Sequence, residues 1–210
     1  QPNTITRVLA HDGEVVGDFA IERRLVVGYE QIAPVLRQAI IATEDGGFEE
    51  HFGLSVSRIV ATVIRDIVYG ERFGASTITQ QLARELFLTE YRRNGVFARS
   101  GFEGLERKLK EMLVAIQIEK RFTKREILAL YANQINLGPG IYGVESAARA
   151  FFDKPASDVT LAEAATIAAT IQTPARLNPF DGPDRNLARR NNTVLPRMAE
   201  EGFITPEEAA

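Results

Sequence analysis

The sequence predicts a mainly α-helical fold preceded by a short β-hairpin. Apolar residues alternate only near the start of the chain, and from Pro34 onward they recur at the spacing of an α-helix. With 210 residues, 45% of them hydrophobic, the chain can bury one substantial core, or one core with a small lobe attached. It contains no run of about 18 apolar residues, so no membrane-spanning segment is expected within it.

The first expected element is a hairpin within Thr4–Ala20. Its apolar residues alternate on both sides of the turn-forming triplet His11–Gly13. A helix is then expected from Pro34 to Glu44, where acids and glycines interrupt the apolar pattern.

Capping boxes mark the starts of several later helices. In each box a hydroxyl residue precedes a carboxylate or amide residue by three positions, and the two side chains satisfy free backbone donors. The pairs are Thr77 with Gln80, Ser100 with Glu103, Thr123 with Glu126, Thr160 with Glu163, and Thr205 with Glu208. Pro206 follows at a first helical position, where its missing N–H costs nothing. The body of the chain is therefore expected to be helical.

Two other segments have distinct patterns. Ser55–Gly70 is amphipathic, and its apolar face is wider than one packing stripe needs. A core helix and a face exposed beside a membrane both account for it. Pro174–Pro183 is rich in turn residues and is expected to be a loop.

Composition excludes several classes of function. The chain has no cysteine, which rules out a disulfide framework, a thiolate metal site and a cysteine nucleophile. Its formal net charge of −3 has the wrong sign for a nucleic-acid-binding protein. Between Arg84 and Arg125, however, eleven basic residues face six acidic ones. That surplus indicates either an anion site or an ordinary solvated helix face.

The first block of residues that could take part in catalysis is Glu44–Gly53. Two acids at a helix end precede a glycine turn, an aromatic residue and a histidine. Burial or the neighbouring Asp45 would make Glu44 a candidate general base, although a solvated helix end has the same pattern. His51 has only His11 as a second histidine, so a zinc cluster is not expected and a supporting role fits it better.

Two more blocks lie further along the chain. Gly74–Arg84 places hydroxyls and amides at a helix start, a pattern that suits either sugar and phosphate binding or simple capping. In Arg107–Glu111, Lys108 and Glu111 are three apart and share a helix face, as a substrate site or a surface ion pair would require. Glu44 and Glu111 together would supply the two carboxylates usual for chemistry at a sugar anomeric carbon.

Taken in order, these blocks resemble the motifs of the peptidoglycan glycosyltransferases, which occur as monofunctional enzymes and as the N-terminal catalytic part of class A penicillin-binding proteins. Glu-Asp-x-x-Phe-x-x-His-x-Gly is complete in Glu44–Gly53, Gly-x-Ser-Thr-Ile-Thr-Gln-Gln in Gly74–Gln81, and Arg-Lys-x-x-Glu in Arg107–Glu111. Two further blocks correspond to Tyr131–Gly143 and to the alanine-rich helix Leu161–Ala169, which is followed by Pro174 and by Asn178 and Pro179.

The resemblance implies a lysozyme-like helical head, a smaller hydrophobic jaw lobe facing the membrane, and the short N-terminal hairpin. One glycosyltransferase domain would fill residues 1–210, with a leader at 1–30, the jaw at about 54–75 and the head in the remainder. A transmembrane anchor and possibly a transpeptidase domain would lie outside this chain. The implied location is the cell envelope, at the extracytoplasmic face of the cytoplasmic membrane.

The resemblance also implies the reaction. Lipid II would be polymerised into β-1,4-linked glycan strands with inversion and release of undecaprenyl pyrophosphate. Glu44 and Glu111 would be the catalytic residues: Glu44 as the general base, and Glu111, with Lys108 and Arg107 nearby, as the residue that organises the donor side. The implied substrate-binding residues are Asp45, Phe48, His51, Ser76, Thr77, Gln80, Gln81, Arg84, Arg107, Lys108, Asn133 and Tyr142. The implied partners and ligands are lipid II, the lipid-linked strand, the membrane surface, a divalent cation (Mg²⁺ or Mn²⁺) and a moenomycin-type inhibitor.

Some positions depart from the family pattern. Arg84 stands where lysine is usual, and Ala132, Asn136, Leu137 and the Thr173–Leu177 run are also variants. These changes affect contacts with phosphate and sugar, but neither glutamate. A lysozyme-like hydrolase would share the head but would need no diphosphate site. A catalytically inactive scaffold would have no need to keep both acids.

Overall fold

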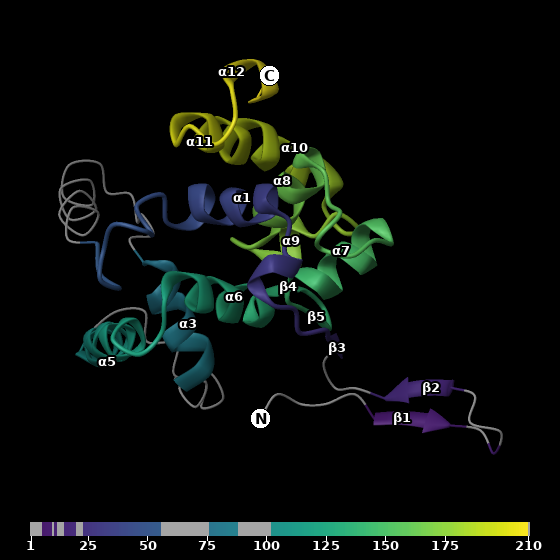
Figure 1. Ribbon diagram of the computed structural model, residues 1–210, viewed down its shortest axis with the longest axis horizontal. Helices are drawn as coiled ribbons and strands as arrows, with labels where there is room; N and C mark the ends of the chain where they lie inside the picture. Colours follow the sequence, from purple (N-terminus) through teal and green to yellow (C-terminus); the bar gives the residue numbers. More distant parts are fainter. Residues whose placement is uncertain are drawn as a thin grey trace. The chain divides into compact units, whose positions relative to one another are not determined.

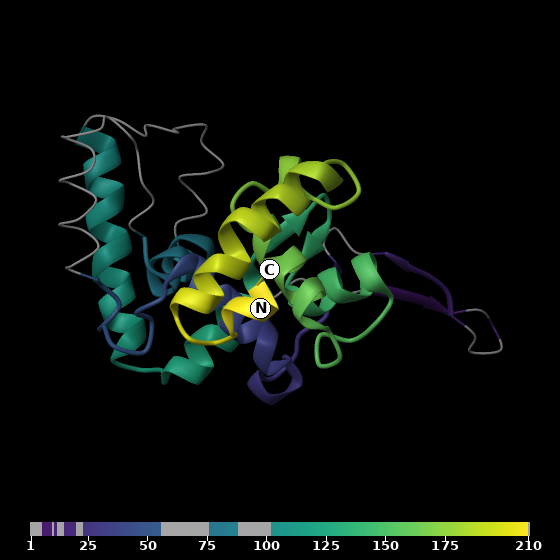
Figure 2. The same cartoon turned by 90° about the horizontal axis from the view of Figure 1, so that it is seen from above.

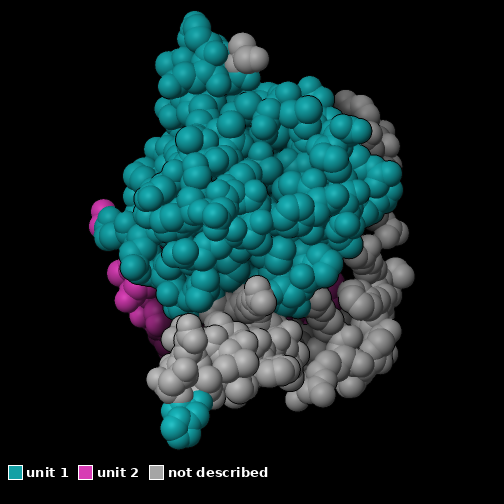
Figure 3. Space-filling view, turned by 90° about the vertical axis from the view of Figure 1, so that its right-hand side faces the viewer, with its two compact units in different colours: residues 1–43, 132–210 teal, residues 44–131 magenta. Residues whose placement is uncertain are grey.

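The computed structural model describes residues 6–9, 11, 15–19, 23–55, 76–87 and 102–209 (Figure 1). The described chain is mainly helical, as the sequence predicts. It divides into two compact units, one formed by residues 1–43 with 132–210 and the other by residues 44–131 (Figure 3). No helix in the described ranges combines the length and apolar content needed to cross a bilayer.

The predicted N-terminal hairpin is present. Strand β1 (Thr6–Leu9) pairs with β2 (Val15–Phe19) in antiparallel register, with Thr6 opposite Phe19. A bulge at Val8 and Leu9 shifts the register near the turn. Alternating apolar residues on both sides of a turn thus form the expected element.

A second sheet, built from three very short strands, was not predicted. Strand β5 (Ile141–Tyr142) lies between β3 (Arg23–Arg24), to which it is parallel, and β4 (Asn136–Gly138), to which it is antiparallel. Strands of two or three residues are too short to show a period in the sequence. The sheet joins the segment before the first helices to the middle of the chain.

Helix α1 (Pro34–Glu44) follows the 3-10 turn η1 (Tyr29–Gln31) and has the predicted bounds. Its buried face packs Leu36, Ala39 and Ile40 into the core of the first unit. Near its C-terminal end, Arg197 Nη1 donates to the carbonyl oxygen of Thr43 at 2.6 Å. A cation there satisfies a carbonyl that the helix leaves without a partner.

The rest of the first unit is a helical cluster. Its elements are α7 (Val144–Phe152), α8 (Leu161–Thr170), α9 (Pro174–Leu177), α10 (Pro183–Arg189), the π-helical turn η2 (Arg190–Val194), α11 (Leu195–Glu200) and α12 (Pro206–Ala209). The buried Asn186 of α10 donates to the Leu177 carbonyl at 2.7 Å and to the Thr170 hydroxyl at 3.0 Å. The prediction of a loop at Pro174–Pro183 is wrong in part, because its first four residues, Pro174–Leu177, form α9.

The second unit contains the loop after α1, helix α3 (Ile78–Phe87), helix α5 (Phe102–Glu119) and most of α6 (Lys124–Gln134). The long α5, seen along its length in Figure 2, packs against α3. Most of the expected jaw segment at about 54–75 and the capping residue Ser100 lie outside the described residues.

The capping boxes are largely confirmed. Both halves form at Thr160 with Glu163, at Thr123 with Glu126, and at Thr205 with Glu208. At Thr77 only half forms: the backbone N–H of Gln80 donates to the Thr77 hydroxyl. The Gln80 carbonyl oxygen instead accepts from Lys108 at 3.1 Å.

Candidate active site

Glu44 is the last residue of α1, and the residue is half-buried. Its Oε2 accepts a hydrogen bond from Gln81 Nε2 of α3 at 2.9 Å. The Gln81 Oε1 in turn accepts from the hydroxyl of Tyr131, on α6, at 3.1 Å. Three segments far apart in sequence therefore meet at the predicted base.

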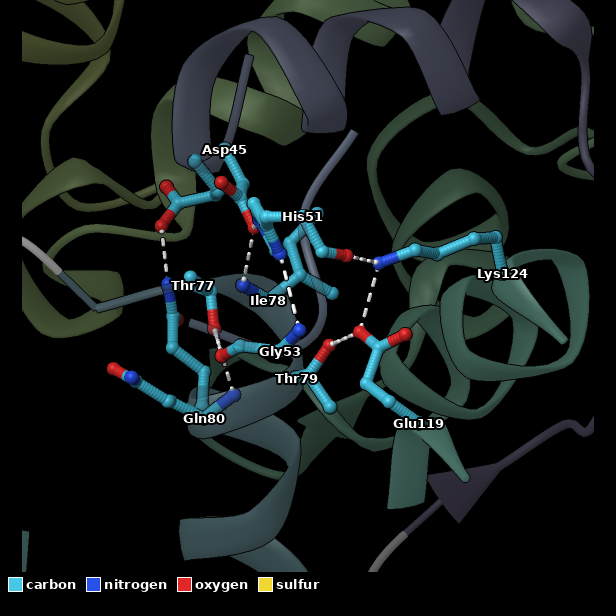
Figure 4. A network of polar contacts seen from close by, with 11 residues as sticks. Asp45, His51, Gly53, Thr77, Ile78, Thr79, Gln80, Glu119 and Lys124 are labelled. Atoms are coloured by element: carbon cyan, nitrogen blue, oxygen red, sulfur yellow. Dashed lines mark hydrogen bonds and ion pairs between the residues drawn. The ribbon is translucent and has the colours of Figure 1, made fainter. Parts of the chain in front are cut away.

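Asp45, the second acid of the block, is buried and fully engaged. Its Oδ2 accepts from His51 Nε2 at 2.9 Å and from the backbone N–H of Ile78 at 3.0 Å (Figure 4). His51 Nδ1 accepts from the Gly53 N–H at 3.2 Å, which leaves Nε2 as the ring nitrogen that faces Asp45. Asp45 and His51 thus join the loop after α1 to the start of α3.

Lys124 and Glu119 complete this network, although no sequence motif predicted a role for either residue. Lys124 Nζ donates to the His51 carbonyl at 2.6 Å and to Glu119 Oε1 at 2.8 Å (Figure 4). The Thr79 hydroxyl also donates to Glu119 Oε1, at 2.6 Å. Phe48 is fully buried beneath Lys124 Nζ, which lies 4.5 Å from the ring centroid. In the sequence, Lys124 and Glu119 were marked only by their position in the Arg84–Arg125 stretch, where basic residues outnumber acidic ones.

Glu111 forms a second acid cluster on α5. Its side chain is 1% exposed, and Arg107 Nη1 bonds to Oε1 while Lys108 Nζ donates to Oε2 at 3.2 Å. Lys108 Nζ also donates to Ser76 Oγ at 2.7 Å. The shared helix face expected for Lys108 and Glu111 is confirmed, and Glu111 is buried rather than part of a surface pair.

Burial sets the electrostatics of Lys108. It lowers the pKa of the Lys108 amine, the Glu111 charge opposes this change, and Arg84 and Arg107 add to it. The side chains of Arg107 and Lys108 remain 28% and 36% exposed. A buried carboxylate thus holds two cations that still reach solvent, an arrangement able to bind an anion.

The start of α3 connects the two acids within the second unit. Gln81 bonds to Glu44, while the adjacent Gln80 bonds to Lys108 and through it to Glu111. The Thr77 hydroxyl donates to the Gly53 carbonyl at 2.7 Å and fixes this helix start to the loop (Figure 4). The block predicted as either a binding site or a cap therefore serves as a cap and also contacts both clusters.

Two predicted substrate-binding residues lie in the first unit. Asn133 is buried, and its amide group donates to the Val27 carbonyl at 2.8 Å and accepts from the Val27 N–H at 3.0 Å. Tyr142 lies in β5 and is partly exposed. Asn133 therefore anchors the segment that leads into α1.

The described residues do not build a metal centre. Within the ranges described, no three His, Asp or Glu side chains come together as a metal site requires. The two acid clusters instead direct their carboxylates at protein donors.

Comparison with known proteins identifies the family. A family model described as Transglycosylase matches residues 12–199. Penicillin-binding protein 1A of Aquifex aeolicus is 45% identical over 208 residues, covering 99% of this chain and 27% of that protein. Penicillin-binding protein 1A of Escherichia coli is 42% identical over 203 residues, covering 96% of this chain and 22% of that protein. This chain thus spans about a quarter of the length of such relatives.

A solved structure supports the fold. The crystal structure of Penicillin-Binding Protein 1A from Haemophilus influenzae matches all of this chain and 20% of that one, with a TM-score of 0.54 and 24% identity. The family model, the relatives and the fold agree with the ordered motif blocks. The chain belongs to the transglycosylase family of the penicillin-binding proteins.

Proposed function

We propose that this domain is a peptidoglycan glycosyltransferase that polymerises lipid II in bacterial cell-wall synthesis. One observation carries the proposal: the start of α3 joins a half-buried glutamate to a second, buried glutamate that holds two cations. Membership of the transglycosylase family supports it.

Glu44 is the proposed general base. Its Oε2 is held by Gln81, whereas its Oε1 receives no hydrogen bond from the residues that the structure describes. The Oε1 atom is thus left to take the proton from the 4-hydroxyl of the acceptor sugar, which is lipid II in this proposal. The acceptor oxygen then forms a bond to the donor anomeric carbon.

The same step breaks the bond from the donor anomeric carbon to the diphosphate oxygen. Attack from the opposite face inverts that carbon and gives a β-1,4 link, and undecaprenyl pyrophosphate leaves from the growing strand. A diphosphate leaving group needs positive charge rather than a proton. Arg107 and Lys108, with Arg84 nearby, are the proposed source of that charge, and Glu111 holds the first two in place.

The other predicted site residues divide by their contacts. Asp45, Phe48, His51 and Thr77 use their side chains within the protein, so we assign them supporting roles. Ser76 and Gln80 bond to Lys108 of the cationic cluster, and we keep them, with the partly exposed Tyr142, as substrate-binding candidates. A moenomycin-type inhibitor would compete at the cationic cluster. The proposed setting is the extracytoplasmic membrane surface of the cell envelope.

No step is assigned to a divalent cation, because the described residues form no protein-built site for one. We still propose Mg²⁺ or Mn²⁺ as a companion of the diphosphate, since such ions bind phosphates with few protein ligands. Adding EDTA to the assay below, and then restoring either ion, measures this contribution.

The test compares the purified chain with Glu44→Gln in detergent with labelled lipid II and separates the products on a gel. An amide cannot accept the hydroxyl proton, so Glu44→Gln should lose at least about 100-fold of the polymerisation rate. Glu49→Gln is the matched control, because Glu49 is exposed in the same loop and should keep full activity.

Each outcome separates the proposal from its rivals. Long, lysozyme-sensitive strands from wild type and Glu49→Gln alone support the polymerase and its base. Cleavage of added glycan would instead favour a hydrolase. Equal turnover by Glu44→Gln would remove Glu44 from the role of base.

A further inference from the structure

We propose that Tyr131 is a positioning residue for glycosyl transfer, because its hydroxyl fixes the orientation of the Gln81 amide and thereby holds the Glu44 carboxylate. The inference rests on the proposed function, since it concerns the same general base. It assigns a role to a side chain that would otherwise count only as core.

Two hydrogen bonds run in a fixed donor-to-acceptor direction, from Tyr131 to Gln81 and from Gln81 to Glu44. Tyr131 is 1% exposed, and its hydroxyl lies 3.1 Å from Gln81 Oε1, an atom that can only accept. With the oxygen of the amide held by this donor, its NH₂ group faces Glu44 Oε2 at 2.9 Å. The hydroxyl therefore selects which end of Gln81 faces the base.

The hydroxyl remains a donor throughout the range of an activity assay. Burial raises the pKa of Tyr131 well above its ordinary value, the Glu44 charge raises it further, and Arg84 partly opposes the increase. Tyr131 consequently does not exchange protons with substrate, and its contribution is one of orientation.

Loss of the hydroxyl would release the amide. A reversed Gln81 would direct its carbonyl oxygen at a carboxylate oxygen, and two acceptors repel each other. The carboxylate would then lose the bond that aims its other oxygen at the acceptor sugar. Because small misplacements of reacting groups slow catalysis by up to about 100-fold, the effect should fall on kcat.

The experiment measures kcat and KM for lipid II with Tyr131→Phe, which keeps the buried ring. We expect kcat to fall at least about tenfold while KM stays within about twofold. Tyr29→Phe is the matched control. Tyr29 belongs to the first unit, where its ring stacks on Arg37, and the kcat of this variant should equal that of the wild type.

A double-variant comparison separates orientation from folding. In a Gln81→Leu background, Tyr131→Phe should cause no further loss of kcat, because the hydroxyl acts only through Gln81. A loss that persists in that background, or one that matches the fraction of unfolded protein by thermal melting, would overturn the inference.

The remaining outcomes are also distinct. Wild-type turnover with an unchanged kcat in Tyr131→Phe would overturn this inference and leave the proposed function standing. A folded wild-type chain with no turnover of lipid II would overturn the proposed function, and this inference with it.

Discussion

At the scale of single residues, Lys108 both forms several hydrogen bonds and has an amine with a lowered pKa. Its amine donates to Ser76, Gln80 and Glu111, and burial lowers its pKa against the opposing charge of Glu111. As pH rises, Lys108 therefore loses its positive charge earlier than an ordinary lysine does. An arginine at this position would keep its charge.

This difference predicts a pH effect. Polymerisation by the wild type should decline as pH rises, and the decline should come at a lower pH than an ordinary lysine would give, because the charge that faces the diphosphate disappears. Lys108→Arg should be slower at neutral pH, since a fork replaces a point charge, but should show no such decline relative to its own maximum. Polymerisation rates measured from neutral pH upward test this prediction. The control variant is Lys110→Arg, because the Lys110 side chain is exposed and pairs with Glu106. An identical decline in all three would assign it to another group.

Residue roles were predictable where they depend on neighbours along one helix. The spacing of Lys108 and Glu111 indicated a shared face, and the structure confirms it. The sequence offered Asp45 as a charge beside Glu44, but it could not show that His51 and the Ile78 N–H occupy that carboxylate. Gln81, Glu44 and Tyr131 are likewise brought together only by folding.

At the scale of elements, local signals worked best. Capping boxes such as Thr160 with Glu163 are local and were found complete. The start of α3 departs from this pattern because Gln80 bonds to Lys108, a contact with a distant helix. The short strands β3, β4 and β5 depend on pairing between remote segments, so no local pattern announced them.

The C-terminal end of α1 offers an element-scale prediction. Arg197 caps it through the Thr43 carbonyl, one residue before Glu44. Arg197→Met should lower the free energy of unfolding by about 1 kcal/mol, the usual net value of such a hydrogen bond. Urea denaturation measures it, and Arg185→Met, which alters an exposed arginine of α10, should change stability little. Equal stability of the two variants would show that the cap contributes nothing.

At the scale of the whole molecule, the two compact units are built differently. One is a continuous stretch, residues 44–131, and the other joins both ends of the described chain. Such a division depends on long-range packing, which sequence periodicity does not report. The single domain with a jaw lobe at about 54–75 stays a prediction.

The second unit carries exposed apolar side chains that bear on the proposed membrane setting. On α3, Leu86 and Phe87 are 36% and 61% exposed, and on α5, Leu109 and Leu113 are 51% and 64% exposed. These two helices pack against each other, so four large apolar side chains reach solvent from one helix pair. Covering apolar surface of this kind with a bilayer is energetically favourable, because it removes that surface from water.

The proposed membrane setting predicts that the chain binds vesicles of phosphatidylethanolamine and phosphatidylglycerol through this helix pair. Replacing both leucines of α5, Leu109→Gln with Leu113→Gln, should weaken binding at least about tenfold, because burying one leucine is worth about 1.5 kcal/mol or more. Co-sedimentation with the vesicles measures it. The matched double variant Leu25→Gln with Leu187→Gln alters leucines of the first unit that are 39% and 45% exposed, and should bind like the wild type. Equal weakening in both double variants would mean that binding follows overall hydrophobicity, and unchanged binding in the α5 variant would remove α5 from the membrane surface.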